Sequence, residues 1–308
     1  MPQTRADSGV ALPDAHRFLL ADEAGGRMWD ACRMPWVPEL FSAPVLERLQ
    51  EKWQRERLEA VPYFDGLMSG ERDALVDSFA GEPELHDPVR GRIRGVRAFD
   101  AFSTEMNAWL RQRNVSVEDV HHVITQPRGF EEVVLHLDGE TERLDVPVAI
   151  VADHDSDGRI DELRVYFSTW PLNGSHANRP PLLQPDPELR PSDVVAEYQR
   201  ALAAGDVDAI METFEPDGYA REPAGGQYIH RGPDGLRAFY EKLFSNDGGI
   251  PLEHCALVDE GRACALEYNV VRWGNTELSP QAGVAVYVRG ESGKLAAARI
   301  YDDADPPL

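Results

Sequence analysis

Two tyrosine and carboxylate pairs recur in this sequence at the same spacing. Tyr63 precedes Asp87 by 24 residues and Tyr198 precedes Glu222 by 24 residues, and each carboxylate stands directly before a proline. A carboxylate placed in an apolar pocket loses solvation, so its pKa rises toward the range of a useful general base. A fixed phenol stabilises negative charge on oxygen better than mobile water does. Such a pair therefore suits reactions that pass through an enolate or an alkoxide.

Ordinary structural roles explain the same residues. Tyr63 and Tyr198 each lie one helical turn before a leucine, so both are also candidate core aromatics. An aspartate or glutamate before proline is common in turns. The change from Asp87 to Glu222 also moves the carboxylate by one methylene, which is enough to misplace a proton acceptor. Because side chains alternate along a strand, the preceding His86 and Arg221 are predicted to point away, toward the surface.

The two pairs belong to a longer internal repeat. Residues 63–88 align without a gap with residues 198–223, and the identical residues are Tyr63/Tyr198, Leu67/Leu202, Gly70/Gly205, Asp73/Asp208, Ala74/Ala209, Phe79/Phe214 and Pro88/Pro223. Later motifs follow in the same order: residues 96–99 match 236–239, and residues 164–166 match 299–301. A period of more than a hundred residues exceeds any solenoid unit, so it indicates two copies of a whole domain.

Each copy is predicted to begin with helices and to end with antiparallel strands. In the second copy a helix over 194–204 turns at Gly205, and a second short helix ends near Phe214. The predicted strands are 117–125, 131–137, 144–152 and 160–167 in the first copy, and 252–258, 262–272, 283–289 and 295–301 in the second. This order predicts an α+β fold. The predicted boundaries are an N-terminal arm (1–42), a first domain (43–172), a Pro-rich linker (173–192) and a second domain (193–308).

The charge of the chain limits the classes of molecule that it is expected to bind. With 54 Asp and Glu against 31 Lys and Arg, the chain carries a net charge of −23, which repels nucleic acid and anionic membranes. A small neutral or cationic ligand fits better. The three cysteines form no disulfide framework, and the N-terminus has no signal-peptide pattern, so a cytoplasmic location is expected.

No metal or other cofactor is predicted. The segment 153–158 resembles the start of a calcium loop, but Arg164 stands at the twelfth position, where a bidentate Glu is needed. A tight turn is therefore expected there. The sequence contains no phosphate-binding glycine loop and no nucleophilic serine motif.

A family resemblance joins these observations. The segment 197–206, Ile210, Phe214, the pair Glu222-Pro223, the helix at 236–240 and the closing strand together resemble the NTF2-like superfamily, in its SnoaL-like and ketosteroid-isomerase-like branch. The resemblance covers residues 194–303 well and residues 60–172 less well. It implies tandem cystatin-like cones, each with about three helices packed on a curved antiparallel sheet around an apolar pocket.

The resemblance also implies roles for particular residues. Asp87 and Glu222 would be the catalytic bases, with Tyr63 and Tyr198 as their oxyanion or acid partners. Tyr240 would contact substrate and hydrogen bond to Tyr198; its counterpart is Asp100, so the two pockets are expected to differ. Steroid isomerases carry a further acid on a late strand. The corresponding segments 146–151 and 283–286 contain none.

The function expected from this resemblance is a cofactor-independent cyclase or isomerase that uses general acid–base catalysis on a hydrophobic, polyketide-like metabolite of secondary metabolism. One alternative is an epoxide hydrolase or cyclase of the polyether type, which requires a second inward-facing carboxylate. Another is a non-catalytic ligand-binding or scaffold protein. Domains of this family often pair through their sheets, which implies an intramolecular pseudo-dimer of the two copies, or a homodimer of the chain.

Overall fold

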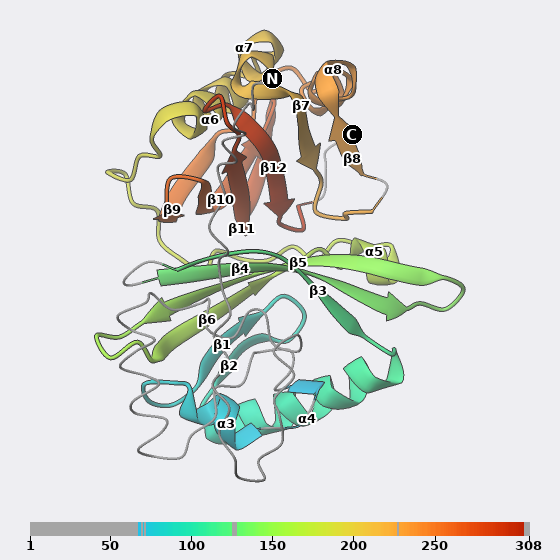
Figure 1. The fold of residues 1–308 in the computed structure, drawn as a ribbon, viewed down its shortest axis with the longest axis vertical. Coiled ribbons are helices and arrows are strands. Elements are labelled where there is room, and N and C mark those ends of the chain that lie inside the picture. The colour runs from blue at the N-terminus through green and yellow to red at the C-terminus, as the bar shows by residue number, and fades with distance from the viewer. Residues whose placement is uncertain (1–66, 69, 71, 125–127, 227, 305–308) are drawn as a thin grey trace, which may run out of the picture. The chain divides into compact units, whose positions relative to one another are not determined.

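The computed structural model describes residues 67–68, 70, 72–124, 128–226 and 228–304. All of them belong to one compact unit formed by residues 34–308. The predicted N-terminal arm and Tyr63 lie outside the described residues. Within these ranges the chain folds into two six-stranded sheets with associated helices (Figure 1). None of the described helices has the length and hydropathy needed to cross a bilayer.

The first copy forms the sheet of order β2-β1-β6-β5-β4-β3. Its elements are α3 (Arg72–Asp77), β1 (Glu84–Asp87), β2 (Gly91–Arg94), α4 (Val96–Gln112), β3 (Ser116–Ile124), β4 (Arg128–Asp138), β5 (Arg143–His154) and β6 (Ile160–Tyr166). A tight turn joins β5 to β6, as predicted, because Oδ1 of Asp155 accepts hydrogen bonds from the backbone amides of Asp157 and Arg159.

The second copy forms the sheet of order β8-β7-β12-β11-β10-β9. Its elements are α6 (Asp193–Ala204), α7 (Val207–Thr213), β7 (Phe214–Arg221), β8 (Ile229–Arg231), α8 (Gly232–Leu243), β9 (Leu252–Asp259), β10 (Ala263–Trp273), β11 (Thr276–Arg289) and β12 (Leu295–Tyr301). The strand order repeats that of the first copy, so the predicted α+β class with two sheet-bearing domains is confirmed.

Strand register confirms the internal repeat residue by residue. Val133 pairs with Val148 in the first sheet, and Tyr268 pairs with Gly283 in the second. The residue numbers on both strands therefore differ by 135 between the two copies. The long predicted strands are all present. The sequence did not predict the short hairpins β1–β2 and β7–β8, nor the parallel pairing of β1 with β6 and of β7 with β12.

The helices of the second copy end and begin where local chemistry requires. Gly205 ends α6 in the left-handed region at φ 70°, and a Cβ there would lie 2.8 Å from the backbone nitrogen of Gly249. Asp206 then caps α7, because its side chain accepts a hydrogen bond from the amide of Ala209. The buried face of α6 carries Tyr198 into the core of the second copy. This turn therefore fixes the position of one predicted site residue.

The linker has more structure than its composition suggests. The short helix α5 (Trp170–Asn173) ends at the first residue of the predicted linker, and the chain then continues without helix or strand to α6. Within it, the buried guanidinium of Arg179 donates to the backbone oxygen of His86 at 2.8 Å and lies over the ring of Tyr166. The linker is thus anchored to the first sheet. The domain boundaries themselves remain predictions.

Each copy has its own apolar core, and a third cluster joins strands of both sheets. The third cluster contains Val123, Phe130, Ala149, Val151, Tyr166, Val258, Ala263, Ala265, Ala282, Val284, Val286 and Tyr301. Burial of this apolar surface stabilises the contact between the two sheets.

Reciprocal ion pairs cross the same contact. Arg164 binds Glu267 through two hydrogen bonds of 2.6 and 2.9 Å. In the mirrored contact, Arg299 binds Glu132, with one bond of 2.8 Å from Nε. The phenols of Tyr166 and Tyr301 also donate to Glu267 and Glu132, at 2.7 and 2.6 Å. Arg164 and Arg299 are matched positions of the repeat, and so are Glu132 and Glu267. Each arginine therefore binds the glutamate of the other copy, which is the pattern of a two-fold interface.

Candidate active site

The second copy encloses a cavity of about 450 Å³. Its lining is largely aromatic and aliphatic, with a few polar groups that include Tyr198, Tyr240, Tyr268, Glu222 and Asp302. A mostly apolar cavity with a small number of placed polar groups is typical of a small-molecule site.

Two phenols in this cavity form the contact expected from the family resemblance. The hydroxyls of Tyr198 and Tyr240 lie 2.9 Å apart, and both side chains are buried. Burial raises the pKa of Tyr198 to about 12 and that of Tyr240 well above its ordinary value. Both therefore stay protonated at neutral pH. Whichever hydroxyl donates to the other, the second keeps a proton that a ligand oxygen can accept.

Asp302 is the acid that the sequence did not reveal. It follows β12 directly, and its Oδ2 accepts a 2.8 Å hydrogen bond from the hydroxyl of Tyr268. Burial raises the pKa of Asp302 to about 6, against the opposing effect of that hydrogen bond. A carboxyl group with this pKa can both take and return a proton near neutral pH.

Gly283 allows this pair to form. It lies opposite Tyr268 in the register of β10 and β11. A Cβ at this position would stand 2.7 Å from Cε2 of Tyr268 and 2.8 Å from Cβ of Asp302, closer than real carbon contacts allow. A glycine within a strand often marks such a close approach.

The predicted base Glu222 also lines the second cavity but has another partner. Its carboxylate lies 2.6 Å from Nε2 of His230, and its side chain is 35 % exposed. The ring of His230 in turn stacks on Phe239 at 4.2 Å. Glu222 is therefore part of a partly solvated pair at the cavity, whereas Asp302 is hydrogen bonded to a buried phenol.

The segment between β6 and α6 contributes to the wall of this cavity. Ser168, Trp170 and His176 all line it, and Trp170 stacks on His176 at 4.8 Å. Asp303 holds the segment from Ser168 to Ala177 in place. Its carboxylate accepts hydrogen bonds from the hydroxyls of Ser168 and Thr169 at 2.5 and 2.8 Å and from the amide of Ala177 at 2.6 Å, and it contacts His176 at 3.0 Å.

The first copy encloses a smaller cavity of about 290 Å³, and Asp87 lines it. Oδ1 of Asp87 accepts hydrogen bonds from the amides of Val89 and Arg90 at 2.8 and 2.7 Å, which is the turn chemistry considered above. The carboxyl group is nevertheless only 2 % exposed, and burial outweighs those bonds and raises its pKa. Asp87 thus has both the turn hydrogen bonds and the burial that its sequence context predicted, while its predicted partner Tyr63 lies outside the described residues.

The register identifies what distinguishes the two cavities. Val133 stands in the first copy where Tyr268 stands in the second, and Phe167 stands where Asp302 stands. The buried phenol and acid pair therefore belongs to the second copy only. Comparison of the two copies held a usable signal, since Phe167 and Ser168 are replaced by Asp302 and Asp303 immediately after the matched strand end.

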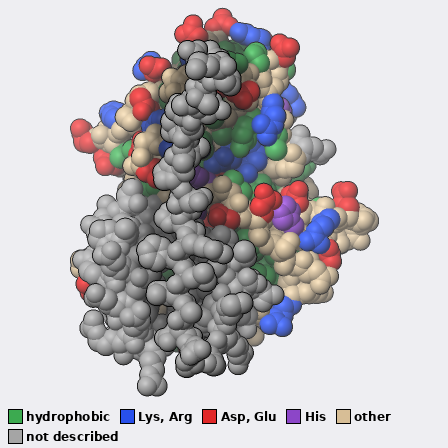
Figure 2. Space-filling view, viewed as in Figure 1, with side chains coloured by type: hydrophobic (Ala, Val, Ile, Leu, Met, Phe, Trp, Pro, Cys, Tyr) green, Lys and Arg blue, Asp and Glu red, His purple; other side chains and the backbone are tan. Residues whose placement is uncertain are grey.

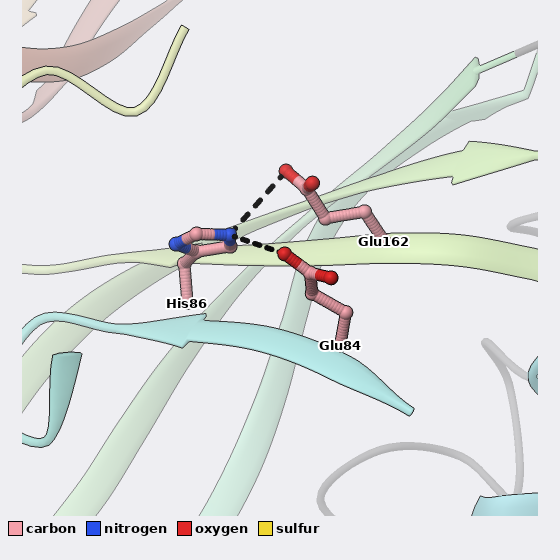
Figure 3. Close-up of side chains that lie close together, drawn as sticks. All are labelled: Glu84, His86 and Glu162. Carbon is pink, nitrogen blue, oxygen red and sulfur yellow. Dashed lines mark ion pairs between the residues drawn. The ribbon is translucent and has the colours of Figure 1, made fainter. Parts of the chain in front are cut away.

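A group with metal-ligand geometry lies elsewhere, on the first sheet. Nε2 of His86 is 3.5 Å from Glu84 and 3.7 Å from Glu162 (Figure 3). The same glutamate oxygens already accept from arginines, at 2.6 Å from Arg92 and 2.9 Å from Arg164. These contacts fit an ion-pair network better than a metal site, because the ligand oxygens are already engaged.

The prediction that His86 and Arg221 are surface residues was wrong. The side chain of His86 is 13 % exposed, and Arg221 is 6 % exposed. His86 lies beside Glu84 and Glu162, and the guanidinium of Arg221 lies 4.7 Å from the ring centroid of Tyr301. On the described surface that Figure 2 displays, acidic and basic side chains are interspersed.

The SnoaL-like domain family matches residues 195–298. No curated protein matches the sequence. A candidate polyketide cyclase from Sinorhizobium meliloti is 21 % identical, with 36 % of this chain and 94 % of that chain covered, at a TM-score of 0.31. A SnoaL-like protein of unknown function from Burkholderia thailandensis is 17 % identical, with 36 % and 92 % covered, at a TM-score of 0.30.

A third structure is SalBIII, described as an epoxide hydrolase/cyclase-like enzyme in pyran ring formation of the polyether salinomycin. It is 23 % identical, with 35 % of this chain and 87 % of that chain covered, at a TM-score of 0.31. The family match falls on the copy that carries Tyr198, Tyr240 and most of the second cavity. Residues 195–298, which lie within the second copy, match the SnoaL-like domain family.

Proposed function

We propose that the second copy is the active domain of a cofactor-independent cyclase or isomerase, which moves a proton on a hydrophobic, polyketide-like metabolite in cytoplasmic secondary metabolism. The observation that carries this proposal is the hydrogen bond between Tyr268 and Asp302 inside a largely apolar cavity. A buried carboxyl group with a pKa of about 6 is suited to general acid–base catalysis.

The reaction divides into two proton transfers. The Asp302 carboxylate removes a proton from the carbon beside a substrate carbonyl, and the Tyr198 and Tyr240 pair donates a hydrogen bond to the resulting enolate oxygen. Protonated Asp302 then returns the proton, either to another carbon in an isomerisation or to the new alkoxide after carbon–carbon bond formation in a cyclisation. Glu222, beside His230, is the second acid–base group of the cavity.

We do not assign catalysis to the first copy. Its cavity keeps Asp87, but no tyrosine is among the described residues that line it. We therefore assign turnover to the second cavity and a packing or ligand-holding role to the first, with Tyr63 as the candidate partner of Asp87. The reciprocal ion pairs support an intramolecular pseudo-dimer of the two copies.

Epoxide opening is a second candidate function, and one observation favours it. That reaction needs one carboxylic acid to protonate the epoxide oxygen and one carboxylate to activate the attacking oxygen. Glu222 and Asp302 line the same cavity, which supplies the second carboxylate that this function requires. Turnover of an aryl epoxide in water enriched in ¹⁸O distinguishes the reactions, because hydrolysis incorporates the label and isomerisation does not.

Solvent-deuterium exchange tests the main proposal. The probe is 2-tetralone, whose hydrogens beside the carbonyl are removed by a general base, followed by proton NMR in D₂O. We expect the protein to accelerate exchange over buffer alone. Binding of the probe without acceleration would instead support the non-catalytic ligand-binding alternative.

A further inference from the structure

Arg221 is the last residue of β7 and lines the second cavity. Its side chain is 6 % exposed, and its guanidinium packs over the ring of Tyr301. Nε and Nη2 are buried and make no hydrogen bond within the described part of the chain. A guanidinium remains charged at any physiological pH, so this is a buried cation whose donors lack an acceptor.

The other buried arginines of the described chain have partners. Arg164 binds Glu267, Arg299 binds Glu132, and Arg179 donates to backbone oxygens that include that of His86. Arg221 differs from all three. Burial of an uncompensated charge is among the most destabilising features a fold can contain, so it usually persists where a function requires it.

The carboxylates that share the cavity are engaged elsewhere. Glu222 follows Arg221 in the chain and contacts His230 at 2.6 Å. Asp302 accepts from Tyr268, and Asp303 is held by the segment from Ser168 to Ala177. None of these groups hydrogen bonds to Arg221 in the described chain. The acceptor for its donors is therefore expected to come from a bound molecule.

We propose that Arg221 is the carboxylate-binding subsite of the second cavity and that the substrate is a hydrophobic carboxylic acid. The planar fork of N–H donors on a guanidinium matches the two oxygens of a carboxylate. The remaining lining of the cavity is mostly apolar, which suits the rest of such a molecule. The net charge of −23 disfavours anions in general, so this local cation is what selects one. The inference deepens the proposed function and rests on it.

Isothermal titration calorimetry with 2-naphthoate and its neutral isostere 2-naphthamide tests the subsite without turnover. Because hydrogen bonds to a charged group contribute about 1.5–3 kcal/mol, wild-type protein is expected to bind the acid about ten- to a hundredfold more tightly than the amide. Arg221→Gln should lose that preference with little change in affinity for the amide, while Arg221→Lys should keep part of it.

Two further variants separate the alternatives. Arg221→Met is expected to melt within about 2 °C of wild type or higher, because a buried charge is removed, whereas a purely structural arginine would give a lower melting temperature. Asp302→Asn is expected to keep the preference for the acid and to lose deuterium exchange. A failure of the catalytic proposal is thereby distinguished from a failure of the Arg221 subsite. Equal binding of acid and amide to wild type, no binding of 2-naphthoate, or an unchanged preference in Arg221→Gln would overturn the subsite.

Discussion

The hydroxyl of Tyr268 donates a 2.8 Å hydrogen bond to Oδ2 of Asp302 across a glycine in the strand between them. Burial raises the pKa of this carboxyl group to about 6. The first copy has Val133 and Phe167 at the corresponding positions, so it lacks both members of the pair. At these two matched positions, a phenol and an acid therefore stand in the second copy alone.

This carboxyl group gives stability a pH dependence of known sign. The pKa of Asp302 is about 6 in the folded chain against an ordinary value of 3.8, so the folded state binds the proton more tightly. The free energy of unfolding should therefore fall as pH rises from about 4 to about 6, by up to about 3 kcal/mol. Asp302→Asn should remove this loss. Urea unfolding at about pH 7.5 is expected to show a more stable variant, with a smaller advantage at about pH 4.5; equal stability at the higher pH would contradict the assignment.

Removal of the phenol of Tyr268 should raise the pKa of Asp302 further. In Tyr268→Phe the ionised form of Asp302 loses a hydrogen bond, so its pKa should rise by about one to two units. The pH at which deuterium exchange reaches half its maximum should move upward by the same amount. Gly283→Ala, which separates the two side chains sterically, should shift the midpoint in the same direction. An unchanged midpoint in both variants would mean that Asp302 is not the titrating group.

The contact between the sheets should depend on its buried glutamates. Glu132→Leu leaves Arg299 and the hydroxyl of Tyr301 without their acceptor, and removal of one partner from a buried pair costs about 3–5 kcal/mol. The matched control is Asp208→Ala, which breaks a solvent-exposed pair with Arg237 and should cost at most about 1 kcal/mol. Chemical denaturation measures both. Similar losses in the two variants would show that the buried pair contributes little.

Asp303 should hold the linker segment against the second cavity. Asp303→Ala removes the acceptor of the amides of Thr169 and Ala177, so both should exchange with deuterium faster, as measured by mass spectrometry of the peptide that contains them. Helix α8, which makes no hydrogen bond to Asp303, serves as the internal reference. Unchanged protection of residues 168–177 would indicate that other contacts hold the segment.

The sequence predicted the architecture because the repeat shows in a direct alignment of the two copies and the strands show in local composition. The mostly apolar runs along 144–152 and 283–289 indicate strands directly. The hairpin β7–β8 was not predicted, because its strands of eight and three residues lie beside turns and show little periodicity. Parallel pairing of β7 with β12 is a long-range contact that no local pattern encodes.

The site was predictable only in part. Tyr198 was found because it repeats Tyr63, and Tyr240 was found because it follows the repeated motif at 236–239; the contact between their hydroxyls was expected. Asp302 was missed because its contact with Tyr268 joins residues 34 positions apart in the sequence, which no local pattern encodes. The partner of Glu222 was missed too, since His230 reaches it only through the turn of the β7–β8 hairpin.

Two carboxylate variants in the 2-tetralone exchange assay test most sharply whether Asp302 is the catalytic base. Asp302→Asn removes the acid of the second cavity, and Asp87→Asn removes the buried carboxylate of the first. We expect Asp302→Asn to slow exchange by about 10²–10⁴-fold and Asp87→Asn to stay within about twofold of wild type. Retention of full exchange by Asp302→Asn, or an equal loss in Asp87→Asn, would contradict this role of Asp302.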